Sequence, residues 1–320
     1  MPNDNAGAKV SFFFDLPILQ FVTTFAPRNS LSFTKKEQKV KVVADSSSTR
    51  TEWALIDGNT VVERASTQGL NPYFLSRREI SHSVRMELPQ VFFKRRWEHV
   101  HFYGAGCSND QKKKSVEASL VAQFKTPVTV ESDMLGAARG LLVDKPGIAC
   151  ILGTGSNSCL YDGYKIIKNV PPLGYVLGDE GSGASLGKLW LSDCLKGIAP
   201  QELRQLFYDK YEVSADKIMD LVYSTPHPNR TLSGYSWFLA ENLDNQYVIQ
   251  LIHNEISRFF SRNISQYEYR KYPVCFVGAV AVAYSQILKQ VADEWGIILS
   301  KIIPGSLPGL IEFHSSTSDK

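Results

Sequence analysis

The sequence has few cysteines, and they follow none of the patterns that cysteine chemistry uses. Five of the 320 residues are cysteine, no two of them form a CxxC pair, and no Cys/His cluster has zinc or iron–sulfur spacing. An odd number of scattered cysteines argues against a disulfide framework and favours reduced core residues in a cytoplasmic protein. The five are Cys107, Cys150, Cys159, Cys194 and Cys275.

The sequence also lacks an excess of charge of either sign. Lys and Arg number 35, Asp and Glu number 32, and the net charge is +3. A balance so close to neutral gives no electrostatic footprint for nucleic acid or an anionic membrane, so we expect neither as a partner. The hydrophobic fraction of 43% and the charged fraction of 21% exclude a disordered, collagen-like or coiled-coil chain. A chain of 320 residues predicts two domains.

Long apolar runs are absent except near the N-terminus, at residues 11–26. That run contains Asp15 and Pro17 and is shorter than the ~20 apolar residues of a spanning helix. Only Lys9 precedes it, whereas a secretory signal has a basic leading region. We interpret residues 1–38 as an N-terminal extension outside the core, with a membrane or export signal as the alternative.

Strand and helix patterns alternate through the first half of the remaining chain, which predicts an α/β fold. Strands are expected at 39–44, 51–56, 60–65, 99–103 and 128–131, and helices at 76–95, 111–124 and 134–142. Further on, we expect strands at 148–152, 158–161 and 273–277, a mostly helical stretch at 186–267 broken at 225–230, and a helix at 279–294.

Two hairpins in this pattern look like copies of each other. Val42–Gly58 and Cys150–Gly163 each consist of an apolar strand, a hydroxyl-rich turn and a return strand that ends in Asp-Gly. A duplicated α/β domain would explain the match. The alternative is that any two hairpins share this chemistry.

Three turns rich in Gly, Ser and Thr each follow an apolar strand, at 46–49, 104–106 and 153–157. Small side chains allow backbone N–H groups to converge on an anion, and ligands of α/β sheets bind beyond the carboxyl ends of strands. A single turn of this kind is more often just a hairpin, whereas two at matching places in a repeat are harder to dismiss. None matches the GxxxxGK[ST] P-loop, and no GxGxxG opens a helix after the first strand, which disfavours Walker-type NTPases and nucleotide redox enzymes.

Two strand-end aspartates carry the chemical hypothesis. Asp45 enters the first turn, where a carboxylate beside a phosphate needs an intervening cation, and Mg²⁺ holding several waters suits that place. Asp133 ends a strand and begins a helix, where it is either a general base for an alcohol attacking a γ-phosphate or only a helix cap. Asp45 has its own alternative, a residue that caps its turn.

The bend Gly178–Gly183 places Asp179 and Glu180 between glycines ahead of a predicted helix at 184–195. Paired carboxylates suit a polyhydroxylated ligand or Mg²⁺, and the alternative is a favourable interaction with the helix dipole. Asn71 precedes a proline and could be a turn residue alone.

With these turns placed, the sequence resembles the N-acetylglucosamine kinase-like branch of the BadF/BadG/BcrA/BcrD ATPase family, in the actin/hexokinase/Hsp70 superfamily. The resemblance covers about residues 39–314, and its most specific motifs are Ile151–Asn157 and Leu177–Gly183. It implies an α/β fold of two actin-like (ribonuclease H-like) domains with a nucleotide cleft between them. The domains would span 39–145 and 146–304, and segment 305–320 would return to the first domain.

The resemblance also assigns roles to individual residues. The first phosphate loop would be Asp45, Ser46, Ser47, Ser48 and Thr49; the second Gly153, Thr154 and Gly155; the catalytic base Asp133; the sugar-binding residues Asn71, Ser156, Asn157, Asp179 and Glu180; and the adenosine side Gly278 and Ala279. Two positions depart from the family pattern, because Ser47 stands where glycine is common and Ala279 where glycine or serine is common.

The implied activity is phosphorylation of an amino sugar by ATP with Mg²⁺, on the 6-hydroxyl of N-acetylglucosamine, by a cytoplasmic enzyme that forms a homodimer. Three alternatives stay open. The chain could be a non-kinase ATPase that drives electron transfer through an iron–sulfur cluster, or a sugar-binding relic with weakened catalysis. A transcriptional sugar sensor would need a DNA-binding domain, for which residues 1–38 are too short and not basic enough.

Overall fold

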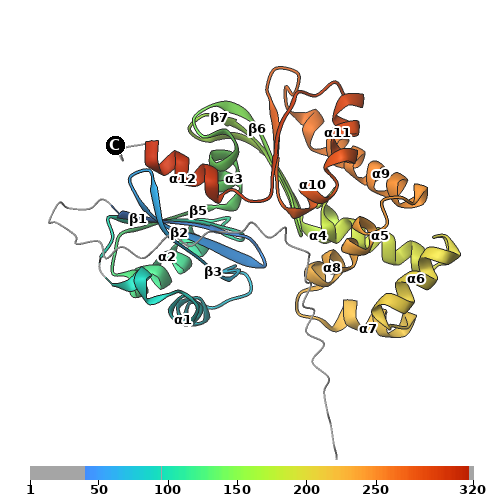
Figure 1. The fold of residues 1–320 in the computed structure, drawn as a ribbon, viewed down its shortest axis with the longest axis horizontal. Coiled ribbons are helices and arrows are strands. Elements are labelled where there is room, and N and C mark those ends of the chain that lie inside the picture. The colour runs from blue at the N-terminus through green and yellow to red at the C-terminus, as the bar shows by residue number, and fades with distance from the viewer. Residues whose placement is uncertain (1–39, 95, 317–320) are drawn as a thin grey trace, which may run out of the picture. The chain divides into compact units, whose positions relative to one another are not determined.

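The computed structural model describes residues 40–94 and 96–316, which form two five-stranded sheets with helices packed on them (Figure 1). The predicted extension, residues 1–38, lies outside the described residues. Within the described ranges, no helix is both long and apolar enough to span a bilayer.

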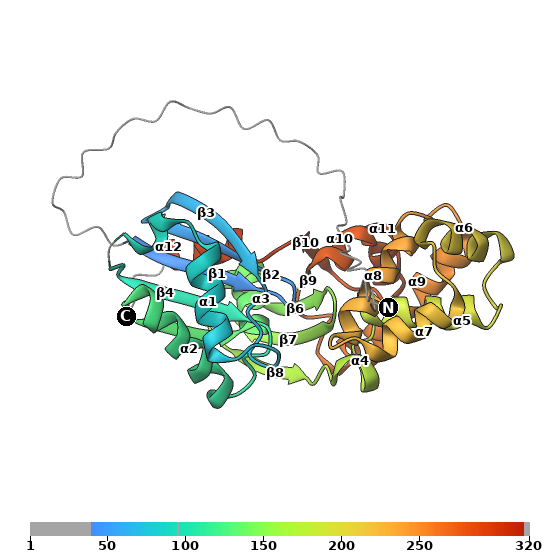
Figure 2. The ribbon, with the colours of Figure 1, turned by 90° about the horizontal axis from the view of Figure 1, so that it is seen from below.

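The first sheet has the strand order β3-β2-β1-β4-β5. Its strands are β1 (Val40–Ser46), β2 (Arg50–Asp57), β3 (Thr60–Gln68), β4 (His99–Gly104) and β5 (Val128–Ser132). β1, β2 and β3 form an antiparallel meander, whereas β4 and β5 run parallel to β1. Helices α1 (Arg77–Glu87) and α2 (Asp110–Phe124) cover one face, where their apolar side chains pack on Trp53 and Phe102 (Figure 2).

The second sheet repeats this arrangement, with the order β8-β7-β6-β9-β10. Its strands are β6 (Pro146–Leu152), β7 (Ser156–Asp162), β8 (Ile166–Val170), β9 (Val274–Val277) and β10 (Leu299–Ile303). β6, β7 and β8 are the antiparallel meander, and β9 and β10 run parallel to β6. Both predicted hairpins therefore occupy the same place in their sheets, and the duplicated α/β domain is confirmed.

The predicted helical stretch between β8 and β9 forms a cluster of helices on the second sheet. These are α4 (Gly174–Leu177), α5 (Gly183–Leu195), α6 (Gln201–Tyr211), α7 (Ala215–Ser224), α8 (Pro228–Ala240) and α9 (Gln246–Arg262). Their shared core centres on Trp190, which stacks on Phe238 with ring centroids 4.9 Å apart. The predicted break at 225–230 falls where α7 ends and α8 begins.

Two predicted helices are shorter than expected. The helix expected at 76–95 ends at Glu87, because Pro89 holds the preceding Leu88 in extended backbone. The helix expected at 279–294 is divided at Tyr284 into α10 (Ala279–Ala283) and α11 (Ser285–Glu294). The Tyr284 hydroxyl donates to the Ser236 carbonyl oxygen at 2.8 Å, which ties this division to α8.

Two further helices, α3 (Asp133–Leu142) and α12 (Leu307–Ser316), pack against each other and on different sheets. Apolar residues of α3 pack on the second sheet, whereas α12 packs on the first sheet, on the face opposite α1 and α2 (Figure 1). The two helices approach most closely at Gly140 and Gly309. A Cβ on Gly140 would lie 2.6 Å from the Ser306 carbonyl oxygen, and one on Gly309 would clash with the Gly140 backbone.

A row of imidazoles lies where α12 meets the first sheet. His314 of α12 stacks on His101 of β4 with ring centroids 3.8 Å apart, and His101 lies 4.5 Å from His99. Burial, together with the nearby charges of His101, Arg139, Lys41 and His99, lowers the pKa of His314 to about 2. His314 is therefore neutral in the folded protein and shares a 2.8 Å hydrogen bond with the Tyr103 hydroxyl.

The α3–α12 contact predicts that Gly309→Ala destabilises the fold. The added methyl group meets backbone rather than a flexible side chain, so we expect the free energy of unfolding to fall by about 1–3 kcal/mol in urea denaturation. Gly305→Ala is the matched control, because its methyl would meet only Glu52 Oε2 at an ordinary 3.5 Å. Equal stability of the two variants would contradict the contact.

The buried imidazole predicts that stability falls on acidification below about pH 6.5. The folded pKa of His314 lies below its ordinary value, so the unfolded chain takes up a proton that the folded chain excludes. The contribution is about 1.4 kcal/mol per pH unit. Denaturation of wild type and His314→Asn between pH 5 and 6.5 should show a weaker pH dependence in the variant. The exposed His82→Asn serves as control, and parallel profiles for all three proteins would contradict this account.

Candidate functional site

The side chain of Ser46 stabilises the first predicted phosphate loop from its buried side. This side chain is buried, its hydroxyl lies 2.7 Å from the Thr51 hydroxyl, and it accepts from the Leu70 backbone N–H at 3.1 Å. The Ser46 hydroxyl thus joins β1, β2 and the segment after β3, and it does not face outward with the rest of the loop. Any contact of Ser46 with a phosphate would have to come from its backbone.

Ser47 stabilises the exposed part of this loop. Its hydroxyl oxygen accepts from the backbone N–H groups of Thr49 and Arg50 at 3.3 and 3.1 Å. Its backbone lies outside the left-handed region, so a serine adopts it without strain. Gly69 passes so near that a Cβ there would lie 2.5 Å from the Ser47 carbonyl oxygen. The departure at Ser47 therefore replaces glycine with a residue that holds the turn.

Asp45 lies half-buried at the end of β1, next to the start of α12. The Ser306 backbone N–H donates to its Oδ2 at 3.1 Å. The pKa of Asp45 is raised to about 6, mainly by burial and further by the charges of Glu52 and Asp133, while the Ser306 hydrogen bond opposes the shift. The parallel register pairs Ser46 with Gly104 and Gly104 with Ser132, so Asp45 and Asp133 lie at the same edge of the first sheet, two strands apart.

Asp133 is the first residue of α3, and it does not cap that helix. The cap is Ser132, whose hydroxyl accepts from the Leu135 N–H at 3.3 Å, so the alternative of Asp133 as the cap is wrong. Asp133 Oδ1 accepts from the Met134 N–H at 2.9 Å, and burial raises the pKa of its carboxyl group. The hydrogen bonds from the Met134 N–H and from the backbone N–H of Asp133 itself oppose this rise in pKa.

Asn71 follows β3 in the chain, and its side chain lies against the turn after β4, which carries Cys107. Asn71 is buried, its Oδ1 accepts from the Tyr73 N–H at 2.9 Å, and Gly106 packs on its amide. Its turn role is confirmed, and among residues 40–94 and 96–316 no acceptor binds its amide NH₂ group. Burial, together with the charge of Asp133, raises the pKa of the Cys107 thiol to about 12, so this thiol is protonated.

The second predicted loop, Gly153–Gly155, rests on the start of α5. The Gly183 and Ala184 N–H groups donate to the carbonyl oxygens of Gly153 and Thr154 at 2.8 and 3.1 Å. Gly278 has a φ of +125° and lies against the backbone of Leu152 and Gly153, where a Cβ would clash. The predicted adenosine side therefore lies next to this loop, with Ala279 exposed at its edge.

Asp179 holds the end of this second loop in place. It is buried, its φ is +54°, and its Oδ1 accepts from the Ser156 N–H at 3.3 Å. Burial raises its pKa to about 6, and the neighbouring Glu180 charge adds to this, while the Ser156 bond and Lys188 oppose it. A hydrogen bond from Asn169 Nδ2 to Asn157 Oδ1, at 2.9 Å, orients the Asn157 side chain.

Glu180 points toward α9 instead of toward this loop. It pairs with Arg262 Nε at 2.7 Å and lies 3.5 Å from Asn263 Nδ2. From the same helix, the buried Glu255 accepts from the Gly181 N–H at 3.1 Å and from the Ser185 hydroxyl. α9 therefore fixes the bend, and the sugar contact expected of Glu180 stays a prediction.

The predicted residues thus form two groups, one on each sheet. Asp45, the first loop, Asn71 and Asp133 lie at the ends of the first sheet's strands, whereas the second loop, Ser156, Asn157, Asp179, Gly278 and Ala279 belong to the second. Sequence reasoning missed Ser306, Arg230 and Glu255, which support these groups. Arg230 of α8 donates through Nη2 to the Ser48 carbonyl oxygen and so joins the second group's helices to the first loop.

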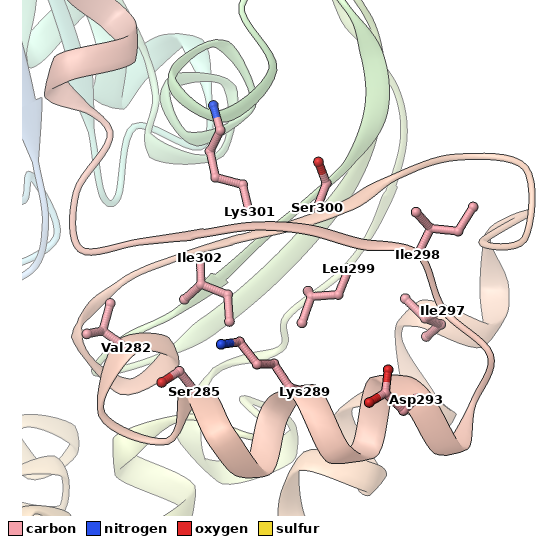
Figure 3. Close-up of a pocket in the computed structure, with 10 residues that line it drawn as sticks. All are labelled: Val282, Ser285, Lys289, Asp293, Ile297, Ile298, Leu299, Ser300, Lys301 and Ile302. Carbon is pink, nitrogen blue, oxygen red and sulfur yellow. The ribbon is translucent and has the colours of Figure 1, made fainter.

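A hollow of about 640 Å³ lies elsewhere, between α11 and β10 (Figure 3). Lys289 points from α11 toward β10, with Ile302 and Leu299 directed toward it, whereas Lys301 points away (Figure 3). None of the predicted site residues lines it. Among the described residues, no cluster of three or more His, Cys, Asp or Glu side chains could by itself hold a metal ion.

Solved structures give close matches to this chain. The "putative N-acetylglucosamine kinase" of Porphyromonas gingivalis is 40% identical, with a TM-score of 0.82, over 86% of this chain and 99% of that one. The "putative N-acetylglucosamine kinase" of Chromobacterium violaceum is 17% identical, with a TM-score of 0.68, over 86% of this chain and 99% of that one.

A ROK family glucokinase from Streptomyces griseus, solved in complex with glucose and AMPPNP, has 14% identity and a TM-score of 0.55 over 86% of this chain and 97% of that one. The last two likenesses establish the fold, which is that of the two-domain, actin-like sugar kinases. Neither a family model nor a curated protein sequence matches the chain. Its identity to the Porphyromonas protein over almost all of that protein's length shows that the chain belongs to the same family as this "putative N-acetylglucosamine kinase".

Proposed function

We propose that the protein is a sugar kinase that transfers the γ-phosphoryl group of ATP to an amino sugar, N-acetylglucosamine, at its 6-hydroxyl. The observation that carries the proposal is the strand register of β1, β4 and β5, which places Asp45 and Asp133 at the same edge of the first sheet. The family relationship supports the substrate, because the 40% identical protein is described as a kinase of this sugar. We also propose that these kinases are a branch of the BadF/BadG/BcrA/BcrD ATPase family.

Asp133 would act as the general base. Its Oδ1 is held by the Met134 N–H, and burial raises its pKa, which makes the carboxylate a stronger base than an exposed one. The carboxylate accepts the proton of the sugar hydroxyl as the hydroxyl oxygen bonds to the γ-phosphorus. The bond between that phosphorus and the bridging oxygen breaks, and its electron pair leaves with ADP.

The residues around Asp45 fit a magnesium ion. Burial and the nearby Glu52 and Asp133 charges raise the pKa of Asp45, so a cation there would relieve an unfavourable concentration of negative charge. A single carboxylate suits Mg²⁺, which binds through few protein ligands and keeps its waters and phosphate oxygens. When bound, Mg²⁺ would neutralise charge on the phosphoryl oxygens.

The sugar would bind between Asn71 and the end of the second loop. The free NH₂ group of Asn71 can donate to a hydroxyl oxygen, and the carboxylate of Asp179 can accept from a hydroxyl group. Ser156 and Asn157 stand directly after the loop and offer further donors. The same arrangement supports the phosphates through the backbone of Gly153–Gly155.

Two further proposals concern the compartment and the oligomeric state of the protein. The five cysteines are free and buried, which supports a reducing compartment, the cytoplasm. A homodimer stays a proposal carried by the family resemblance alone.

The test is ADP release from Mg²⁺-ATP with a panel of amino sugars, followed by analysis of the phosphorylated product. We expect N-acetylglucosamine to give the fastest release and one sugar 6-phosphate per ADP. Asp133→Asn should lower turnover by about 10²–10⁴-fold while sugar binding is retained, because the variant keeps the side-chain shape but loses the base.

Asp162→Asn is the matched control, because Asp162 caps only its own exposed turn, with Oδ1 accepting from Tyr164 and Lys165. ADP release that is independent of sugar would replace the proposal with an ATPase. Turnover of Asp133→Asn close to that of wild type would remove Asp133 as the base.

A further inference from the structure

Arg230 lies in the first turn of α8, and its backbone is tied to the second phosphate loop. α8 packs on α5 so closely that a Cβ on Gly187 would clash with the Leu232 backbone, and one on Gly183 with the Ser233 hydroxyl. The Gly183 N–H in turn donates to the Gly153 carbonyl oxygen at 2.8 Å. The position of the Arg230 backbone is therefore fixed relative to this loop.

The side chain of Arg230 reaches the other loop. Its Nη2 donates to the carbonyl oxygen of Ser48, and its guanidinium lies 5.9 Å from the centre of the Phe74 ring. His227 also contacts Phe74. The two rings meet edge-on, with their centroids 4.7 Å apart. One arginine thus joins the helix that supports the second loop to the backbone of the first.

The charge of Arg230 has no anionic partner among residues 40–94 and 96–316. No carboxylate there forms an ion pair with it, and its Nε is buried without a hydrogen-bond partner. The contrast is with Arg258 and Arg262 of α9, which pair with Glu255 and Glu180. A partly buried guanidinium with only a carbonyl and an aromatic ring for neighbours is a costly arrangement unless an anion joins it.

The surrounding groups do not supply that anion. Burial lowers the pKa of His227, and the charge of Arg230 lowers it further, so this imidazole is neutral. Burial also lowers the pKa of Arg230 itself, which is the expected response of a charge lacking compensation. A guanidinium has five N–H donors in a planar fork that matches the oxygens of a phosphate group.

We propose that Arg230 binds the phosphate chain of a nucleoside triphosphate, with its guanidinium donating to the terminal phosphoryl oxygens. The inference rests on the proposed kinase function, and it adds a phosphate-binding residue from outside both Gly, Ser and Thr-rich loops. In this role the guanidinium of Arg230 either gives up its hydrogen bond to the Ser48 carbonyl oxygen or keeps it while other N–H groups donate to the nucleotide. It stabilises the charge that develops on the phosphoryl group during transfer.

The competing role is a purely structural tie between α8 and the first loop. That role affects the folding of the loop and changes the binding of every nucleotide alike. Direct contact with the terminal phosphates instead discriminates between nucleotides with and without them. The relative affinities for AMPPNP and AMP therefore separate the two roles without reference to turnover.

The experiment titrates wild type, Arg230→Gln and Arg230→Lys with AMPPNP and with AMP, in Mg²⁺, by calorimetry. We expect Arg230→Gln to weaken AMPPNP binding by about 10–100-fold, the range for a hydrogen bond to a charged group, and to leave AMP binding unchanged. Arg230→Lys should fall between, because it keeps the charge but loses the fork. Arg204→Gln is the control, since Arg204 Nε also donates to a backbone carbonyl oxygen, that of Ala199, at 3.0 Å.

Each result decides the proposal. Equal weakening of AMPPNP and AMP, or no weakening of either, reduces Arg230 to a structural tie and leaves the kinase function standing. Wild type that fails to bind AMPPNP removes the kinase function and this inference together. If thermal denaturation shows that Arg230→Gln is unfolded, the Arg230→Lys ratio decides on the same terms.

Discussion

The close crossing of α3 and α12 holds both acidic side chains of the candidate site. Gly140 of α3 lies against the Ser306 backbone and Gly309, which fixes the start of α12 relative to α3. α3 begins with Asp133, and the Ser306 N–H that opens α12 donates to Asp45. Two glycines therefore permit the approach that places one carboxylate from β1 and one from α3 in the same neighbourhood. The chemistry of the site depends on this packing more than on either loop alone.

Electrostatics explains why such a site suits a charged substrate. Three of its carboxyl groups, on Asp45, Asp133 and Asp179, have raised pKa values, in each case mainly through burial. The proposed magnesium ion would offset this negative charge on the Asp45 side, and Arg230 offers an uncompensated positive charge near the first loop. The triphosphate would thus meet cations from both groups of residues, while Asp133 stays free to take a proton.

Local sequence patterns predicted most strands, the loops and the aspartates at strand ends. A strand followed by a turn of small residues is determined by residues that are neighbours in the sequence. The motif pair at 151–157 and 177–183 added the resemblance to N-acetylglucosamine kinases, which implied the sugar-binding residues. The patterns could not predict partners that folding brings from far along the chain. Ser306 lies 261 residues from Asp45, Arg230 lies 182 from Ser48, and Glu255 lies 74 from Gly181. The edge strands β8 and β10 were missed because most of their side chains are exposed or half-buried and carry no apolar period.

The proximity of Asp45 and Asp133 has a direct test that needs no substrate. Nuclear magnetic resonance of the aspartate carboxyl carbons would give the pKa of Asp45 in wild type and in Asp133→Asn. The structure predicts a wild-type value of about 6 and a lower value in the variant, because one of the charges that raise it is removed. An Asp45 pKa that is ordinary in wild type, or that does not change in the variant, would contradict the shared site.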